Sequence, residues 1–463
     1  MRLIAENVGP FERLDIDFSD GSGKPHRGPH ILAGVNGSGK STVLRAIAWA
    51  LSSLESGFPE DEWRHFLRGP ESRVLVQVLD GANGLYINAG TADAADGWSE
   101  RLEAWARSSR APGEIDRLLW LGFGEGGTET RRPVARNREP LIAAYASARG
   151  LSYVGTPAKM ESLKSPTDVS LGFESTVQNR AIQRWLVDLF SKEALAKGRG
   201  QEFDSYGQTI ARFQDALKLV CGDRDISVDV ELEPNLEPRV NLHGKNLNFS
   251  QLSDGLRTTM GWLADFMMRQ DQMGSTNDGK REGILLLDEI EIYLHPKWQR
   301  TLLPAMRKAL PDVQIIASSH SPFVISSCED ARVHVLTLDE SGAAHAQPPQ
   351  DAPFGESVTA TLRDIFGVES RFDVQTERDL AEWDDLKREE VIGKLAAAKR
   401  KRLETLSGEL SERSEELRLI VKSPSALQKS FLNTLVSRSP QRPPQARPPK
   451  GNGNRAPRSS KLG

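Results

Sequence analysis

Apolar and polar residues alternate in two pairs of short runs near the start of the chain. Arg2–Val8 and Arg13–Phe18 flank a Gly-Pro pair, and Ser72–Leu79 and Leu85–Ala89 flank the sequence DGANG. A period of two predicts half-buried strands, and Gly-Pro or Asp-Gly sequences between such strands predict turns. We therefore expect two β-hairpins in this part of the chain.

Short apolar runs and segments of helical periodicity alternate through the rest of the sequence up to about residue 350. Strands are predicted at His30–Ala33, Ile226–Glu233, Arg239–Leu242, Ile284–Leu287 and Val313–Ala317. Helices are predicted from about Ser41 to Leu54, at Thr176–Ala196, Tyr206–Val220 and Pro296–Ala309, and after Ser253. Such alternation indicates an α/β fold in which a mixed sheet is flanked by helices.

The character of the sequence changes after about Asp351. Glu377–Val421 is charge-rich and helical in pattern, and its leucines recur at roughly heptad spacing (Leu395, Leu403, Leu406, Leu410 and Leu417). From Ser437 onward there are seven Lys or Arg residues, no acidic residue, and abundant Pro and Gly. Because such a composition cannot form a core, residues 437–463 are expected to be a disordered basic tail.

The overall composition is typical of a soluble cytoplasmic protein. The chain has 463 residues, of which 38% are hydrophobic, enough for at least one large core. Its formal net charge of −4 provides no global attraction for nucleic acid. Cys221 and Cys328 lack metal-ligand spacing and are expected to be structural thiols. Neither a signal-peptide pattern nor an apolar run long enough to span a membrane is found, so no membrane segment is expected.

A glycine-rich loop follows the predicted strand His30–Ala33. Gly34–Ser41 fits the pattern G-x-x-x-x-G-K-S/T. Its glycines would let backbone N–H groups turn toward phosphate oxygens, and the following helix adds its positive end. Lys40, expected as an exposed loop side chain, would reach the β- and γ-phosphates, and the Ser41 hydroxyl would bind Mg²⁺. The sequence therefore predicts an ATP site formed by Asn36, Gly37, Ser38, Gly39, Lys40, Ser41 and Thr42.

Two carboxylates end a second apolar strand, since Ile284–Leu287 is followed directly by Asp288 and Glu289. A buried parallel strand would bring Asp288 beside the glycine-rich loop, where it could hold Mg²⁺ through water. Glu289 would then polarise the attacking water. Taken alone, the same sequence could also be a strand that ends in a solvated acidic turn.

A serine and a glycine lie about thirty residues before this strand, in the segment Asn248–Arg257. Ser253 would be the N-cap of an amphipathic helix. A helix N-terminus with a free hydroxyl and a nearby glycine, Gly255, binds phosphate well. A capped helix without a ligand explains the segment equally well in isolation.

The order of these motifs resembles that of ATP-binding cassette (ABC) proteins. The phosphate loop, LSDG at residues 252–255, ILLLDE at 284–289 and SSHSP at 318–322 follow one another as in that family. LSDG resembles the LSGGQ signature, with Asp in the third place and no Gln. His320 matches the switch histidine that senses the γ-phosphate. The segment DEIEIYLHP at 288–296 looks like the DExExxLHP segment of the RecF, OLD and SMC-like branch.

Membership of that branch implies a composite ATP site in a homodimer. ATP would lie between Lys40 of one subunit and Ser253 of the other, because the signature helix is too far from the phosphate loop of its own chain. The roles that the resemblance implies are ATP binding by Ser253 and Gly255, Mg²⁺ binding by Ser41 and Asp288, and catalysis by Glu289 and His320.

Composition and resemblance together divide the chain into five parts. Residues 1–150 would form an ATPase lobe with the phosphate loop, 151–225 a helical insert, and 226–350 a second ATPase lobe. Residues 351–436 would be a helical C-terminal extension, ahead of the basic tail. The family's glutamine loop is not evident; Leu141–Gly150, with Tyr145 and Arg149, lies where the two lobes should join, and no ligand is assigned to it.

The process that the ATPase serves is inferred from the compact layout. An OLD nuclease would carry a metal-binding Toprim domain after the switch histidine, but D-x-D is absent there, and neither an H-N-H pair nor long coiled-coil arms are found. The chain resembles ATPases of bacterial anti-phage defence, of the PtuA type of Septu and retron-associated systems, which work with a separately encoded HNH nuclease. The alternatives are a RecF-like DNA repair ATPase and an OLD-type ATP-dependent nuclease. Basic runs at Lys399–Arg402 and within Thr130–Arg138 could contact DNA or be solvated faces.

Overall fold

The computed structural model divides into two compact units, Met1–Val368 and Glu369–Gly463, which are described separately. The described residues are 1–20, 26, 28–51, 66–69, 72–80, 82–89, 117–122, 141–146, 163, 165–167, 169–173, 176–200, 205–232, 236–274, 282–368 and 372–422. Thr130–Arg138, Arg149 and the basic tail lie outside them. Within these ranges, no helix is both long and apolar enough to cross a membrane.

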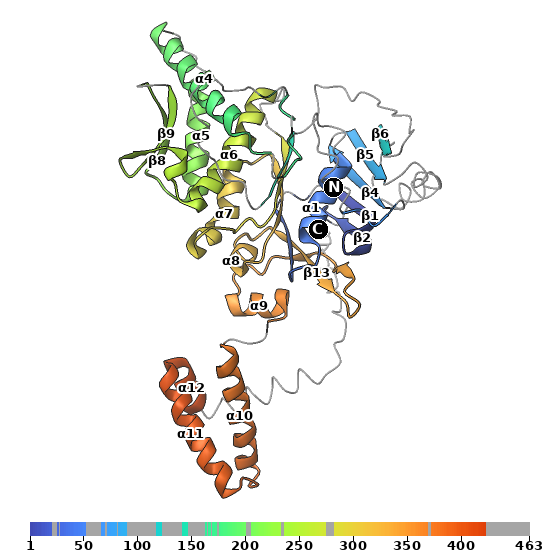
Figure 1. Ribbon diagram of the computed structural model, residues 1–463, viewed down its shortest axis with the longest axis vertical. Coiled ribbons are helices and arrows are strands. Elements are labelled where there is room, and N and C mark those ends of the chain that lie inside the picture. Colours follow the sequence, from blue (N-terminus) through green and yellow to red (C-terminus); the bar gives the residue numbers. More distant parts are fainter. Residues whose placement is uncertain are drawn as a thin grey trace, which may run out of the picture. The chain divides into compact units, whose positions relative to one another are not determined.

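A seven-stranded mixed sheet forms the centre of the first unit (Figure 1). Its order is β14 (Ala344–Ala346), β13 (Arg332–Leu338), β3 (His30–Gly34), β12 (Val313–Ser318), β11 (Gly283–Leu287) and β7 (Leu141–Tyr145), with β15 (Gln350–Asp351) paired to β13. The strands from β13 to β7 are parallel, whereas β14 and β15 pair antiparallel to β13. The carboxyl ends of β3, β11 and β12 therefore meet at one edge of the sheet.

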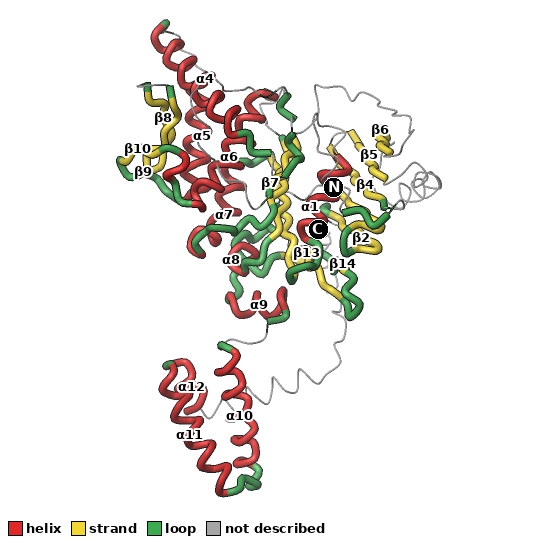
Figure 2. The backbone as a smooth tube through the Cα atoms, viewed as in Figure 1, coloured by secondary structure: helices red, strands yellow, loops and turns green. Residues whose placement is uncertain are grey.

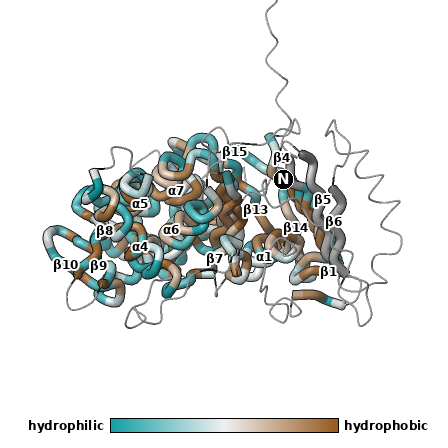
Figure 3. The backbone as a smooth tube through the Cα atoms, turned by 90° about the horizontal axis from the view of Figure 1, so that it is seen from above, coloured by the Kyte–Doolittle hydropathy of each residue, from teal (hydrophilic) through white to brown (hydrophobic). Residues whose placement is uncertain are grey.

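The strands of this sheet contribute to two hydrophobic cores, one on each face. One face is covered by α4 (Asn179–Gly198), α5 (Ser205–Cys221), α6 (Asp254–Met273) and α7 (Pro296–Ala309), and the other by α1 (Lys40–Leu51). In β11, Leu285 and Leu287 enter the first core, while Ile284 and Leu286 enter the second. Apolar strands lie between α6 and α1 in Figure 3. A strand buried on both faces needs such a continuous apolar run, and the predicted mixed sheet flanked by helices is confirmed.

A second, five-stranded sheet packs against α1. Its order is β2 (Phe11–Asp17), β1 (Arg2–Val8), β4 (Arg73–Asp80), β5 (Ala82–Ala89) and β6 (Arg117–Gly122). Both predicted hairpins are confirmed, because β1 pairs antiparallel with β2 and β4 pairs antiparallel with β5. The sequence did not predict β6, which pairs parallel with β5.

A small three-stranded sheet lies beside α4 and α5 (Figure 2). It consists of β8 (Ile226–Glu231), β9 (Glu237–Leu242) and β10 (Lys245–Leu247), and the 3-10 turn η4 (Phe249–Gln251) follows it. The predicted strands at 226–233 and 239–242 are thus confirmed, and α7 has the predicted bounds. The helices α8 (Pro322–Ile325) and α9 (Val358–Phe366) complete the first unit.

The second unit contains α10 (Val374–Val391), α11 (Ala397–Arg413) and α12 (Glu415–Lys422). Four of the predicted leucines are buried in its core with Trp383 and Leu386, namely Leu403, Leu406, Leu410 and Leu417. Two members of the basic run on α11 are paired with acids of α10: Lys399 Nζ lies 2.6 Å from Glu389 Oε1, and Arg402 lies 2.7 Å from Glu382. These ion pairs favour the interpretation of that run as a solvated face.

Candidate nucleotide-binding site

The glycine-rich loop joins β3 to α1 at the carboxyl edge of the large sheet. Gly37 and Gly39 have φ values of +81° and +91°, a region that favours glycine. A Cβ atom on Gly39 would lie 2.4 Å from the Phe11 ring, so only glycine fits there. The predicted residues Asn36 to Thr42 thus form one continuous turn that ends in the first turn of α1.

The Lys40 side chain folds into this loop. Its Nζ donates hydrogen bonds to the carbonyl oxygens of Gly34 (3.1 Å) and Val35 (2.9 Å), and only 6% of the residue is exposed. The expectation of an exposed loop lysine is therefore wrong, because two carbonyl groups of the loop hold its ammonium group. Burial lowers the pKa of Lys40, while the carboxylates of Asp288, Glu289 and Glu291 act in the opposite direction.

Asp288 lies at the end of β11, next to the start of α1. Its Oδ1 accepts hydrogen bonds from the hydroxyls of Ser41 (2.9 Å) and Ser318 (2.6 Å). Its N–H donates to the carbonyl of Tyr145 at 2.9 Å, which fixes the strand end. The structure thus brings together the two predicted magnesium ligands, a hydroxyl and a carboxylate, which are the hard oxygen donors that Mg²⁺ prefers.

A buried polar atom supports the fit of a phosphate group to the loop. The Ser38 side chain is fully buried, and its Oγ has no hydrogen-bond partner among the described residues. A Cβ on Gly34 would approach this oxygen to 2.8 Å, so glycine leaves it room. Because an unpaired buried hydroxyl is unfavourable, Ser38 is suited to pair with a group supplied by a ligand.

Glu289 and His320 flank the same edge of the sheet. Glu289 has a φ of +46° and its N–H donates to Ser318 Oγ at 2.7 Å. The N–H of His320, just after β12, donates to Glu291 Oε1 at 2.5 Å. Burial, followed by the charge of Lys40, lowers the pKa of His320, against the carboxylates of Glu291, Glu289 and Asp288. The sequence analysis assigned no role to Glu291. Its position three residues after Asp288, in the segment DEIEIYLHP, could have indicated that it belongs to the same site.

The signature segment stands at the start of α6. Ser253 is the N-cap residue, as predicted, but its exposed hydroxyl makes no capping hydrogen bond. Gly255 is buried, and a Cβ there would lie 2.6 Å from the carbonyl oxygen of Tyr293. The glycine thus lets α6 pack against the turn that follows Asp288. The Ser253 hydroxyl remains available to a ligand or another chain.

A buried polar network ties α6 to β7. The Tyr145 hydroxyl donates to Asp265 Oδ2 at 2.8 Å, and Asp265 pairs with Arg269 at 2.6 Å, with both charged side chains fully buried. Arg269 also donates to the carbonyl oxygens of Pro166 and Thr176. Burial, with the charge of Asp265 adding to it, raises the pKa of Tyr145 well above its ordinary value. The main chain of Tyr145 thus contacts Asp288 at the end of β11, and its side chain contacts Asp265 on α6.

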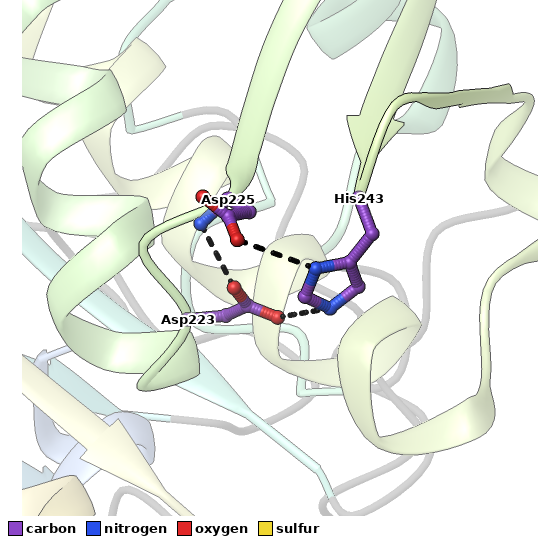
Figure 4. Close-up of side chains that lie close together, drawn as sticks. All are labelled: Asp223, Asp225 and His243. Carbon is purple, nitrogen blue, oxygen red and sulfur yellow. Dashed lines mark hydrogen bonds and ion pairs between the residues drawn. The ribbon is translucent and has the colours of Figure 1, made fainter.

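A further group of potential metal ligands lies away from this edge, at the small sheet (Figure 4). The two ring nitrogens of His243 face different carboxylates: Nε2 lies 3.1 Å from Asp223 Oδ2 and Nδ1 lies 3.5 Å from Asp225 Oδ2. These contacts tie the β9–β10 turn, which carries His243, to the segment just before β8.

Comparison with known proteins gives the class of this site. The chain belongs to the family described as "AAA domain, putative AbiEii toxin, Type IV TA system", whose model matches residues 30–326. The matched region includes the glycine-rich loop, the start of α6 with Ser253, the end of β11 with Asp288, and His320. An ATPase domain of this family implies ATP binding.

Two relatives indicate the branch of the family. "Retron Vc95 probable ATPase" of Vibrio cholerae serotype O1 biovar El Tor is 28% identical over 72% of this chain and 73% of its own length. "Septu protein PtuA" of Bacillus thuringiensis is 20% identical over 79% of this chain and 84% of its own length. Among solved structures, the "SMC head domain from Thermotoga maritima" matches 75% of this chain and 97% of that chain, with 13% identity and a TM-score of 0.36. The chain is thus an AAA-domain protein related to the Septu protein PtuA and to retron probable ATPases.

Proposed function

We propose that the chain hydrolyses ATP in an anti-phage defence complex, and that its catalytic site is completed by a second copy of itself. The observation that carries the first part is the pairing of Ser41 with Asp288 beside the glycine-rich loop. A hydroxyl and a carboxylate at this place would hold Mg²⁺, which would supply positive charge to offset that of the phosphates.

Each remaining group has a role in this proposal. The loop N–H groups, Ser38 and Lys40 would bind the phosphates, because donors and positive charge at a helix N-terminus attract anions. Glu289 would orient and polarise the attacking water, since it lies one residue from the metal ligand and is half-buried. His320 would contact the γ-phosphate from the neighbouring strand end.

Dimerisation is supported by the exposed hydroxyl of Ser253 at the start of α6. Ser253 stands at a helix N-terminus with an exposed hydroxyl that makes no hydrogen bond within the described chain. Such a group would complete the phosphate site of a second subunit, in the arrangement that the resemblance to ABC proteins implies. A homodimer related by a two-fold axis would then contain two equivalent composite sites.

The defence role and the HNH nuclease partner rest on the relatives named above and on the compact layout. The purified chain with Mg²⁺ should hydrolyse ATP and leave DNA intact, and should cut DNA only together with the nuclease encoded beside it. Metal-dependent cutting by the chain alone would instead favour an OLD-type nuclease. ATP-dependent loading of other proteins on DNA, without any nuclease, would favour a RecF-like repair ATPase.

A further inference from the structure

The turn after Asp288 carries a third carboxylate, Glu291. It lies between two non-glycine residues of positive φ, Glu289 (+46°) and Tyr293 (+62°). The N–H groups of Ile292 and Leu294 donate to the carbonyl oxygens of Glu289 and Glu291, which closes two successive turns. Non-glycine residues rarely adopt this conformation, and where they do, function is a common reason. The turns direct Glu291 back toward the end of β12.

Two side chains of this region fix the segment that contains His320. Glu291 Oε1 accepts the main-chain N–H of His320 at 2.5 Å. The Gln299 side chain donates to the carbonyl of Leu294 at 2.8 Å, and its own oxygen accepts the hydroxyl of Ser321 at 2.7 Å. The segment at 320–321 is therefore held from both sides against the turn.

The negative charge of Glu291 is not needed for this contact alone. An amide oxygen would accept the N–H of His320 as well, and Glu291 Oε2 is buried without a partner among the described residues. Burial of an unpaired carboxylate oxygen is unfavourable. The same charge faces Lys40 and His320, and it counteracts the lowering of their pKa values by burial. The Glu291 carboxylate thus adds a negative charge that favours the protonated forms of Lys40 and His320.

We infer that Glu291 is a positioning residue of the ATPase site, which holds the backbone of His320 and thereby aims the imidazole at the γ-phosphate. This inference rests on the proposed function. Glu291 acts through His320 and does not contact the nucleotide. Its loss should therefore lower the rate of turnover, whereas ATP affinity, which depends on the glycine-rich loop, should change little. Misplacement of a catalytic group by about 1 Å can lower a rate by about 10²-fold.

The kinetic test compares three variants of the full chain. Glu291→Ala should lower kcat by about 10²-fold, with KM for ATP changed by less than about twofold. Glu291→Gln should recover much of this loss, because its amide oxygen can still accept the N–H of His320. Glu356→Ala, at an exposed loop position, is the matched control and should behave as the unmutated protein.

The second test reads the contact itself by NMR, on protein labelled with ¹⁵N-histidine and without nucleotide. The hydrogen bond to the Glu291 carboxylate should shift the His320 amide proton downfield; Glu291→Ala should move it upfield, and Glu291→Gln should move it less. Unchanged kcat or an unmoved amide signal in Glu291→Ala would overturn the inference, as would equal impairment of ATP affinity and turnover. If the unmutated protein binds no ATP, the proposed function fails, and that is seen before any variant is made.

Discussion

Ser41 and Asp288 lie 247 positions apart in the chain, yet the Ser41 hydroxyl donates a 2.9 Å hydrogen bond to the Asp288 carboxylate. The parallel order β3–β12–β11 produces this contact, because it brings the carboxyl ends of the strands and the start of α1 to one edge. Ser318, at the end of β12, donates to the same oxygen at 2.6 Å. The site therefore depends on the sheet and not on any single motif.

Nucleotide binding should depend on the charge of Lys40. Lys40→Met keeps an apolar stem in the buried position but removes the ammonium group. ATP affinity should fall by roughly 10- to 150-fold, which corresponds to about 1.5–3 kcal/mol for hydrogen bonds to a charged group. Calorimetry measures this loss. Lys308→Met, at an exposed site on α7, is the control; equal ATP affinity in both variants would contradict the assignment of the loop.

Hydrolysis should depend on Glu289 but nucleotide binding should not. In Glu289→Gln, Asp288 still pairs with Ser41, so Mg-ATP should bind, whereas turnover should fall by about 10²- to 10⁴-fold because water is no longer polarised. The ATP-bound dimer should then accumulate and be detected by light scattering. Turnover close to that of the unmutated protein would place the base elsewhere.

The buried ion pair on the signature helix should matter far more for stability than an exposed pair of the same spacing. Asp265→Ala leaves Arg269 buried without its carboxylate, and should lower the free energy of unfolding by about 3–5 kcal/mol. Arg184 and Asp188 form an exposed pair on α4, so Asp188→Ala should cost less than about 1 kcal/mol. Denaturant titration of both variants makes the comparison, and similar losses would contradict it.

The buried histidines His30 and His334 should make the first unit sensitive to acid. Their side chains are hydrogen-bonded at 3.0 Å across β3 and β13. Burial, together with nearby positive groups, lowers the pKa of His30 well below its ordinary value and that of His334 to about 4. Because the unfolded chain binds these protons more readily, stability is full above the unfolded pKa near 6.5 and is lost as the pH falls toward 4.

From His334 alone, the free energy of unfolding should decrease by roughly 2 kcal/mol between pH 7 and pH 5. His334→Asn removes this titration while retaining a polar group for His30, so its melting temperature should vary less with pH. His345→Asn, on the exposed face of β14, is the control. If all three proteins lose stability equally over this range, the neutral histidine pair is not the cause.

Local sequence patterns predicted both hairpins, β3, β11, β12 and α7, but they did not predict β6, β7 or β13, nor the contacts made by tertiary packing. The run ILLL and the Pro296 start of α7 are local signals, and both elements form where they were predicted. The burial of Lys40 and the contact of Glu291 with His320 depend on how turns from distant segments meet. The Tyr145–Asp265–Arg269 network joins residues up to about 120 positions apart, and no local pattern specifies it.

The composite site is tested most directly by mixing two variants, Ser253→Arg and Lys40→Met, at an ATP concentration too low to occupy the weakened site of Lys40→Met. Ser253 is exposed and its hydroxyl makes no capping bond, so the first variant should fold and bind ATP but not hydrolyse it. In a mixed dimer, one site carries both lesions and the other carries neither, so up to about half of the normal activity per mixed dimer should return if the sites act independently. Each variant mixed only with itself should stay inactive. Normal hydrolysis by Ser253→Arg alone would contradict the account, because Ser253 would then have no role in the ATP site.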